Sequence, residues 1–158
     1  LGGTLSMYTA SAIFTAEHLG SDKGFAAHVA VYPACWIHEA IARGTSRNKP
    51  LNNARAYSKL TGAPIHILAG DKDQLDDPEG CKNFLEALSP QSRKFVELTV
   101  YPGATHVWDA GRNYVYFDRA GCKGQGCQVQ VEYNPEVTAK GRQFVVDFFS
   151  KHLDAPSR

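Results

Sequence analysis

Short apolar stretches alternate along this chain with stretches in which apolar side chains recur at helical spacing. Three of the apolar stretches are short enough to be buried strands, and they cover residues 25–32, 64–69 and 94–101. Helical spacing predicts helices over residues 4–19, 78–88 and 135–153. Strands that alternate with helices are typical of an α/β fold, with a mostly parallel sheet flanked by helices.

Two regions give a weaker pattern. Between the first two strands we expect a short helix over residues 36–42, a polar loop over 44–50 and a second helix over 51–60. After the third strand, residues 114–117 and 128–133 are short extended segments on either side of a glycine-rich stretch. The sequence therefore predicts two extended arms joined by a tip that is either stapled or flexible.

Ionisable residues that could take part in catalysis follow the second and third predicted strands. The second strand runs into Asp71-Lys72-Asp73, and the third passes through a Pro-Gly turn to His106. Open α/β sheets carry their chemistry at the carboxyl ends of the strands. A carboxylate that accepts a hydrogen bond from a histidine fixes its tautomer, so that the histidine can act as a base. We expect such a pair here; a solvated acidic turn and a loop histidine bonded to backbone are the alternatives.

The chain opens with Leu1-Gly2-Gly3, a glycine-rich turn directly before a predicted helix. The order of this turn, the acid and the histidine matches the order of nucleophile, acid and histidine in α/β-hydrolases, whose nucleophile lies in a G-x-S-x-G turn. On this interpretation the nucleophile precedes Leu1, and the backbone N–H of Leu1 is an oxyanion donor at the start of a helix. A Gly-Gly turn that opens an ordinary helix is the alternative.

Taken together, the chain resembles the carboxyl-terminal half of a dienelactone hydrolase family protein, which is an α/β-hydrolase. The segments that carry the resemblance are Leu1-Gly2-Gly3-Thr4, His28-Val29-Ala30-Val31-Tyr32-Pro33, Leu68-Ala69-Gly70-Asp71-Lys72-Asp73 and Tyr101-Pro102-Gly103-Ala104-Thr105-His106. The resemblance implies that residues 1–158 are a partial α/β-hydrolase domain, with the amino-terminal strands and the nucleophile elbow upstream of residue 1. It implies Asp73 as the triad acid, with Asp71 as the substitute, and His106 as the base.

The activity that the resemblance implies is hydrolysis of a carboxylic ester or lactone by a Ser or Cys nucleophile, without cofactor or metal. The expected partners are a small-molecule ester or lactone and the upstream half of the same protein. Trp36 and Trp108 are the candidate substrate-binding residues, and packing of a loop is the alternative role for Trp36. A prolyl oligopeptidase-type serine peptidase and a hydrolase-like binding protein without a nucleophile are the alternatives.

Composition narrows the range of partners. The chain has 17 Lys and Arg residues against 16 Asp and Glu residues, without a basic run, so we expect no nucleic acid as a partner. No apolar stretch is long enough to cross a bilayer, and we expect a soluble protein without a membrane partner.

The four cysteines allow three pairings. Cys122 and Cys127 bracket the glycine-rich tip, where a disulfide would restrict its motion, and Cys35 and Cys81 both follow strand ends and could meet near the site. Two disulfides would imply an oxidising, exported or periplasmic location, whereas free thiols would fit the cytoplasm.

Overall fold

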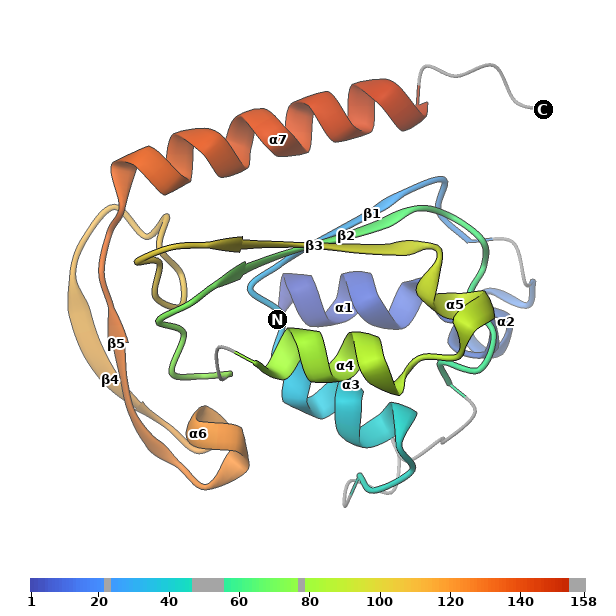
Figure 1. Cartoon of the computed structure of the whole chain (residues 1–158), viewed down its shortest axis with the longest axis horizontal. Coiled ribbons are helices and arrows are strands. Elements are labelled where there is room, and N and C mark those ends of the chain that lie inside the picture. The colour runs from blue at the N-terminus through green and yellow to red at the C-terminus, as the bar shows by residue number, and fades with distance from the viewer. Residues whose placement is uncertain (22–23, 47–55, 77–78, 154–158) are drawn as a thin grey trace.

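Three parallel strands form the central sheet, in the order β1 (His28–Val31), β2 (Ile65–Gly70) and β3 (Val96–Tyr101) (Figure 1). The computed structural model describes residues 1–21, 24–46, 56–76 and 79–153. Gly70 at the end of β2 pairs with Tyr101 at the end of β3, so these two strands finish side by side. All three predicted strands are confirmed, and the loops that follow β2 and β3 begin at one edge of the sheet.

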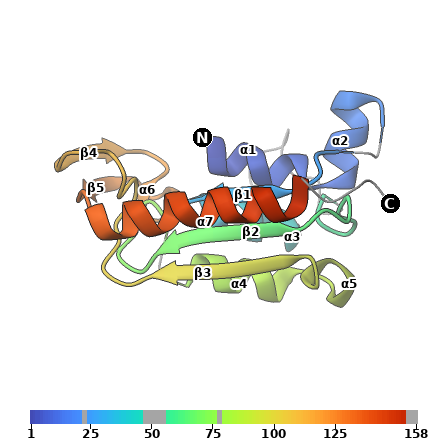
Figure 2. The ribbon, with the colours of Figure 1, turned by 90° about the horizontal axis from the view of Figure 1, so that it is seen from above.

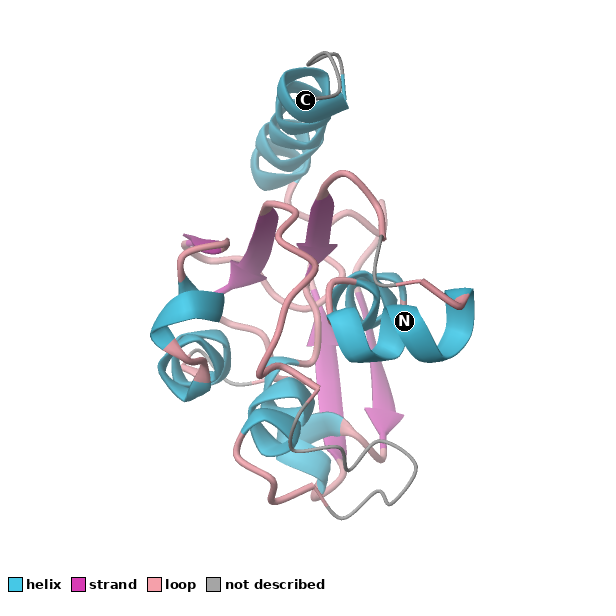
Figure 3. Cartoon of the chain, turned by 90° about the vertical axis from the view of Figure 1, so that its right-hand side faces the viewer, coloured by secondary structure: helices cyan, strands magenta, loops and turns pink. Residues whose placement is uncertain are grey.

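Helices cover both faces of this sheet. One face carries α1 (Gly2–Thr9), α3 (Cys35–Ala42) and α4 (Gly80–Ala87), and α7 (Pro135–Leu153) runs along the other face (Figures 1 and 2). The side view in Figure 3 shows the same layers, with α7 at the top. The predicted α/β class is confirmed.

Apart from His66, the strand β2 is apolar along its whole length. Side chains of a strand point alternately to opposite faces, and a strand covered on both faces therefore needs apolar residues at successive positions. Ile67 belongs to the core on the side of α1, α3 and α4, while Leu68 packs with Trp108 and Val137 under α7. Both side chains are fully buried.

The prediction of a single helix over residues 4–19 is wrong, because the helix is interrupted at Ser11. Helix α1 ends at Thr9, and α2 (Ala12–Leu19) begins after Ser11, whose backbone is extended. The Ser11 hydroxyl donates to the carbonyl of Ala56 and accepts a bond of 3.4 Å from the N–H of Phe14. These side-chain bonds compete with helix continuation and cap the start of α2.

Other predicted boundaries need adjustment. The predicted short helix is confirmed as α3. Residues 56–59 form turns and Leu60 pairs with Ser11 in an isolated bridge, so the end of the second predicted helix is wrong. Three predictions lie partly or wholly outside the described residues. They are residues 51–55 of that predicted helix, most of the predicted loop at 44–50, and the predicted helix start at Pro78. A further short helix, α5 (Pro90–Arg93), connects α4 to β3.

The two extended arms form an antiparallel hairpin of β4 (Tyr114–Asp118) and β5 (Cys127–Val131). The short helix α6 (Gly121–Gly124) forms the tip, and the disulfide between Cys122 and Cys127 staples it. The hairpin lies beyond the carboxyl ends of the sheet strands (Figure 1). Within the described part of the chain, no helix combines the length and apolarity needed to cross a membrane.

Candidate active site

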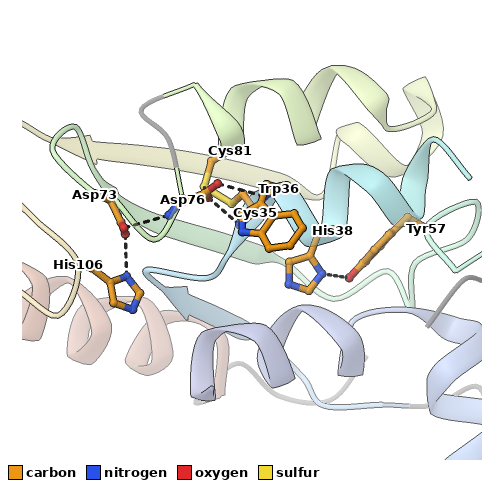
Figure 4. The surroundings of a disulfide bond; sticks show 8 residues. All are labelled: Cys35, Trp36, His38, Tyr57, Asp73, Asp76, Cys81 and His106. Carbon is orange, nitrogen blue, oxygen red and sulfur yellow. Dashed lines mark hydrogen bonds and ion pairs between the residues drawn. A yellow bond between two sulfur atoms is a disulfide. The ribbon is translucent and has the colours of Figure 1, made fainter. Parts of the chain in front are cut away.

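Asp73 and His106 form a buried hydrogen-bonded pair at the carboxyl end of the sheet. Asp73 follows β2 and His106 follows β3, and Oδ2 of Asp73 lies 2.8 Å from Nδ1 of His106 (Figure 4). Asp73 is 5% exposed and His106 is 8% exposed. Because β2 and β3 end at paired positions, the loops that follow them bring these two side chains together.

The carboxylate of Asp73 is oriented by its own loop. Its Oδ1 accepts hydrogen bonds from the backbone N–H groups of Leu75, at 2.8 Å, and Asp76, at 3.2 Å. This leaves Oδ2 directed at His106. An ionised carboxylate only accepts hydrogen bonds, so with Asp73 ionised a neutral His106 carries its hydrogen on Nδ1 and its lone pair on Nε2.

Asp71 has a different task. Its Oδ1 accepts a hydrogen bond of 2.6 Å from the backbone N–H of Gly103. Gly103 has a φ of +74°, in the left-handed region that the Pro-Gly turn requires. Asp71 therefore stabilises the turn that leads to His106, whereas Asp73 contacts the histidine itself.

Tyr32, which no sequence pattern marks as a site residue, contacts the ring of His106. It follows β1 with a φ of 37°, and its ring centroid lies 5.1 Å from that of His106 and 4.9 Å from that of Trp108. Its hydroxyl donates to Oδ1 of Asp109 at 3.0 Å. Burial and the charge of Asp109 raise the pKa of Tyr32 to about 12, so the hydroxyl stays neutral. A strained conformation at a strand's carboxyl end is a frequent mark of functional sites.

The two candidate tryptophans lie in different surroundings. Trp108 is 2% exposed and packs between Tyr32 and Tyr101, which makes it a support for Tyr32 and argues against direct substrate contact. Trp36 lies in the first turn of α3, beside Asp76 rather than beside His106 (Figure 4). A Cβ added to Gly124 at the hairpin tip would lie 2.8 Å from the ring of Trp36, so the tip packs directly against this ring. Substrate contact by Trp36 stays a prediction.

Asp76 connects the acid loop to α3. Its carboxylate accepts hydrogen bonds from the N–H groups of Cys35, at 2.6 Å, and Trp36, at 3.1 Å, and so caps a helix that lacks a cap of its own. Burial raises the pKa of Asp76 to about 7, against the lowering effect of the Cys35 N–H. The disulfide between Cys35 and Cys81 joins α3 to α4 at the same point (Figure 4).

Both disulfides match pairings considered for the sequence. Potential ligand atoms of Cys35, Asp76 and Cys81 lie within 4.8 Å of one another. The two sulfur atoms are bonded to each other, however, so they are not available as the thiolates that a zinc site uses. This cluster therefore has a structural role, since it connects α3 to α4 and to the loop of Asp76.

His38, on α3, belongs to the core and not to the site. It is fully buried, and its Nδ1 lies 2.5 Å from the hydroxyl of Tyr57. Burial lowers the pKa of His38 to about 3, so the ring is neutral.

The first turn of α1 packs against the carboxyl end of β1. A Cβ added to Gly3 would lie 2.4 Å from the carbonyl oxygen of Val31 and 3.1 Å from the nitrogen of Pro33. Tyr32, between these two residues, contacts His106. The start of α1 therefore lies at the same edge of the sheet as the acid–histidine pair (Figure 1).

A parallel sheet between helices, with a buried Asp–His pair at its carboxyl edge, has the architecture of an α/β-hydrolase. The profile of the dienelactone hydrolase family matches residues 1–153, and the chain belongs to this family.

Two known proteins are similar to this chain. A monoglyceride lipase from Saccharomyces cerevisiae is 34% identical over 70 residues, which are 44% of this chain and 21% of the lipase. The solved structure of a thermophilic esterase from Thermogutta terrifontis, with propionate bound, matches with a TM-score of 0.56 and 17% identity. That match covers 99% of this chain and 55% of the esterase, and it supports the fold. The chain thus spans about a fifth of the lipase and about half of the esterase.

Proposed function

We propose that this protein hydrolyses carboxylic esters or lactones. The observation that carries the proposal is the buried hydrogen bond of 2.8 Å between Asp73 and His106. Membership of the dienelactone hydrolase family and the similarity to proteins named as a lipase and an esterase support it. The proposed chemistry uses protein groups alone.

In the proposed mechanism, a Ser or Cys joined to the amide of Leu1 is the nucleophile. Nε2 of His106 takes its proton while the oxygen or sulfur attacks the carbonyl carbon, and Asp73 stabilises the imidazolium. The backbone N–H of Leu1 donates to the oxyanion of the tetrahedral intermediate. The packing of Gly3 against β1 supports this placement, because it holds the start of α1 at the edge where His106 lies.

The intermediate then collapses. His106 returns the proton to the leaving alcohol, and an acyl-enzyme remains. Water attacks the acyl group while Nε2 takes one of its protons, and breakdown releases the carboxylic acid and restores the nucleophile with its proton. With a lactone, the alcohol remains attached to the acyl group, and the product is a hydroxy acid.

The test uses the full-length protein that contains this chain, with p-nitrophenyl acetate and a small lactone as substrates. His106→Gln should lower kcat on the substrate that wild type hydrolyses by about 10³-fold, because the nucleophile loses its base. His18→Gln is the matched control, since His18 is an exposed side chain of α2. Unchanged turnover in His106→Gln would contradict the proposal.

A second test concerns the nucleophile itself. A Ser or Cys directly before Leu1 in the full-length sequence supports the enzyme, whereas Gly or Ala there would favour a hydrolase-like binding protein. The preceding residue also fixes which variant to make: its replacement by Ala should abolish acyl-enzyme formation, measured by intact mass after incubation with substrate.

We propose further that the protein resides in an oxidising compartment. The pairs Cys35–Cys81 and Cys122–Cys127 support an exported location, because disulfides persist outside reducing compartments. The protein is isolated from its natural source, denatured without reductant and alkylated. Alkylation should label none of these four cysteines, and labelling of all four would overturn the proposal.

A further inference from the structure

The β4–β5 hairpin is hydrogen-bonded to both loops that carry the acid–histidine pair. Strand β5 pairs with β4 along one edge, and residues two apart on a strand direct their amides to the same side. The N–H of Gln130 donates to Oε1 of Gln74, and the N–H of Glu132 donates to the hydroxyl oxygen of Thr105, each at 2.8 Å. Gln74 directly follows Asp73, and Thr105 directly precedes His106.

Gln74 is held from a second side by the tip of the hairpin. Its carbonyl oxygen accepts a hydrogen bond of 2.9 Å from the N–H of Cys122. Cys122 adopts a φ of 52° and is joined to Cys127 by a disulfide, which restricts the conformation of the tip. The side chain and the backbone of Gln74 are thus both attached to the hairpin.

Thr105 has the corresponding position on the histidine side. It is 4% exposed, so its hydroxyl is enclosed by protein. Besides accepting from Glu132, this hydroxyl lies 3.4 Å from the carbonyl oxygens of His106 and Glu132, to which it can donate. A valine at this position would have the same shape and no acceptor for the Glu132 N–H.

We propose that Gln74 and Thr105 are positioning residues that fix the Asp73–His106 geometry through the hairpin. The acid and the base lie on separate loops, and the hairpin hydrogen-bonds both loops to one two-stranded unit. An error of about 1 Å in the placement of a reacting group can lower a rate by about 10²-fold. The predicted effect on turnover rests on the proposed hydrolase function, whereas the effect on the hydrogen bond does not.

The kinetic test compares Thr105→Val with Thr105→Ser in the full-length protein. Thr105→Val should lower kcat on p-nitrophenyl acetate by about 10- to 100-fold, with KM within about twofold of wild type. Thr105→Ser keeps the hydroxyl and should stay within about threefold of wild type. Gln128→Ala is the control on β5, since its side chain is exposed and the substitution leaves the strand's amides in place.

A spectroscopic test reads the Asp73–His106 hydrogen bond directly. The Nδ1–H of His106 should give a downfield proton signal that is absent in His106→Gln and protected from exchange in wild type. Thr105→Val should shift this signal and speed its exchange by about tenfold or more, while Thr105→Ser restores the wild-type behaviour. Gln74→Ala, a change at an exposed position, should act in the same direction and serves if Thr105→Val does not fold.

The two tests separate the two proposals. An unchanged signal in folded Thr105→Val and Gln74→Ala would overturn the positioning role, whatever the activity. A wild-type protein without ester or lactone turnover whose signal still responds to these variants would overturn the proposed function and leave the positioning role intact. Equal losses of kcat in Thr105→Ser and Thr105→Val would also overturn the positioning role, because the Thr105 hydroxyl would then not be the cause.

Discussion

Replacing Asp73 by asparagine should reverse the tautomer of His106. Oδ1 of Asp73 accepts two backbone N–H groups, from Leu75 and Asp76, while Oδ2 faces a single donor, Nδ1 of His106. Asparagine offers one oxygen instead of two. The amide oxygen should occupy the Oδ1 position, because the opposite orientation would set its NH₂ group against two N–H donors. The NH₂ group then donates to Nδ1, and the ring hydrogen moves to Nε2.

The expected loss of activity follows from this reversal. With hydrogen on Nε2, the ring cannot accept the proton of the nucleophile. The same Asp-to-Asn change in the serine protease triad lowers kcat by about 10⁴-fold, which corresponds to about 5 kcal/mol of activation free energy. We expect a similar size here, because Asp73 is 5% exposed and water has little access to replace the carboxylate. The two backbone bonds to the side chain survive, so the fold should persist.

The assay measures kcat on p-nitrophenyl acetate for Asp73→Asn and for the matched control Asp71→Asn. The control should stay within about tenfold of wild type, since an asparagine oxygen can still accept from the N–H of Gly103. Nitrogen-15 NMR of the labelled imidazole identifies the ring nitrogen that carries hydrogen. The reasoning is refuted if Asp73→Asn keeps the Nδ1–H tautomer, and a larger loss in Asp71→Asn would make Asp71 the functional acid.

Three further predictions concern stability. The pKa of Asp76 is raised from 3.8 to about 7, so the folded state favours its protonated form, and stability should fall by up to about 3 kcal/mol between pH 5 and pH 8. Urea unfolding at several pH values should show a smaller fall in the free energy of unfolding for the non-titrating Asp76→Asn. An equal pH dependence in the two proteins would contradict this assignment. Gly3→Ala should lower Tm, because the new Cβ would meet a carbonyl at 2.4 Å, whereas Gly2→Ala, with nothing within 4 Å, should leave it equal or higher. Replacing Cys35 and Cys81 together by Ala should cost about 4 kcal/mol for a separation of 46 residues, against about 2 kcal/mol for the hairpin disulfide with a separation of 5; equal losses in denaturant unfolding would argue against a loop-entropy origin.

The strands and the two key side chains were accessible from sequence for a physical reason. A parallel strand covered on both faces is mostly apolar, so β1 and β2 stand out against their surroundings, and β3 does so despite Glu97 and Thr99. The residues that follow neighbouring strands then meet at one edge, which made the Asp–His pair predictable. The choice between Asp71 and Asp73 depended on the turn after β2, where the amides of Leu75 and Asp76 fold back onto one carboxylate.

Features that depend on local competition escaped prediction. Ser11 lies in a pattern that suits a continuous helix, and only its bond to the distant carbonyl of Ala56 reveals the break. Tyr32 was visible only as the end of an apolar strand. Its contact with His106 follows from a backbone of positive φ, which is uncommon for a residue with a Cβ and has no sequence signature of its own.

The role of the hairpin is hidden from sequence in a more general way. Its bonds to the side chains of Gln74 and Thr105 start from the backbone N–H groups of Gln130 and Glu132, and every residue except proline carries that group. The side chains of these two residues bond to each other at 2.6 Å on the exposed surface, so their chemistry gives no sign of what their amides do. Only the acceptors, Gln74 and Thr105, carry side-chain information, and each is an ordinary polar loop residue beside a more conspicuous Asp or His. A free strand edge usually invites unwanted pairing. In this chain the loops of the acid and the base bind that edge, which gives the hairpin a stabilised position and the site a fixed geometry at once.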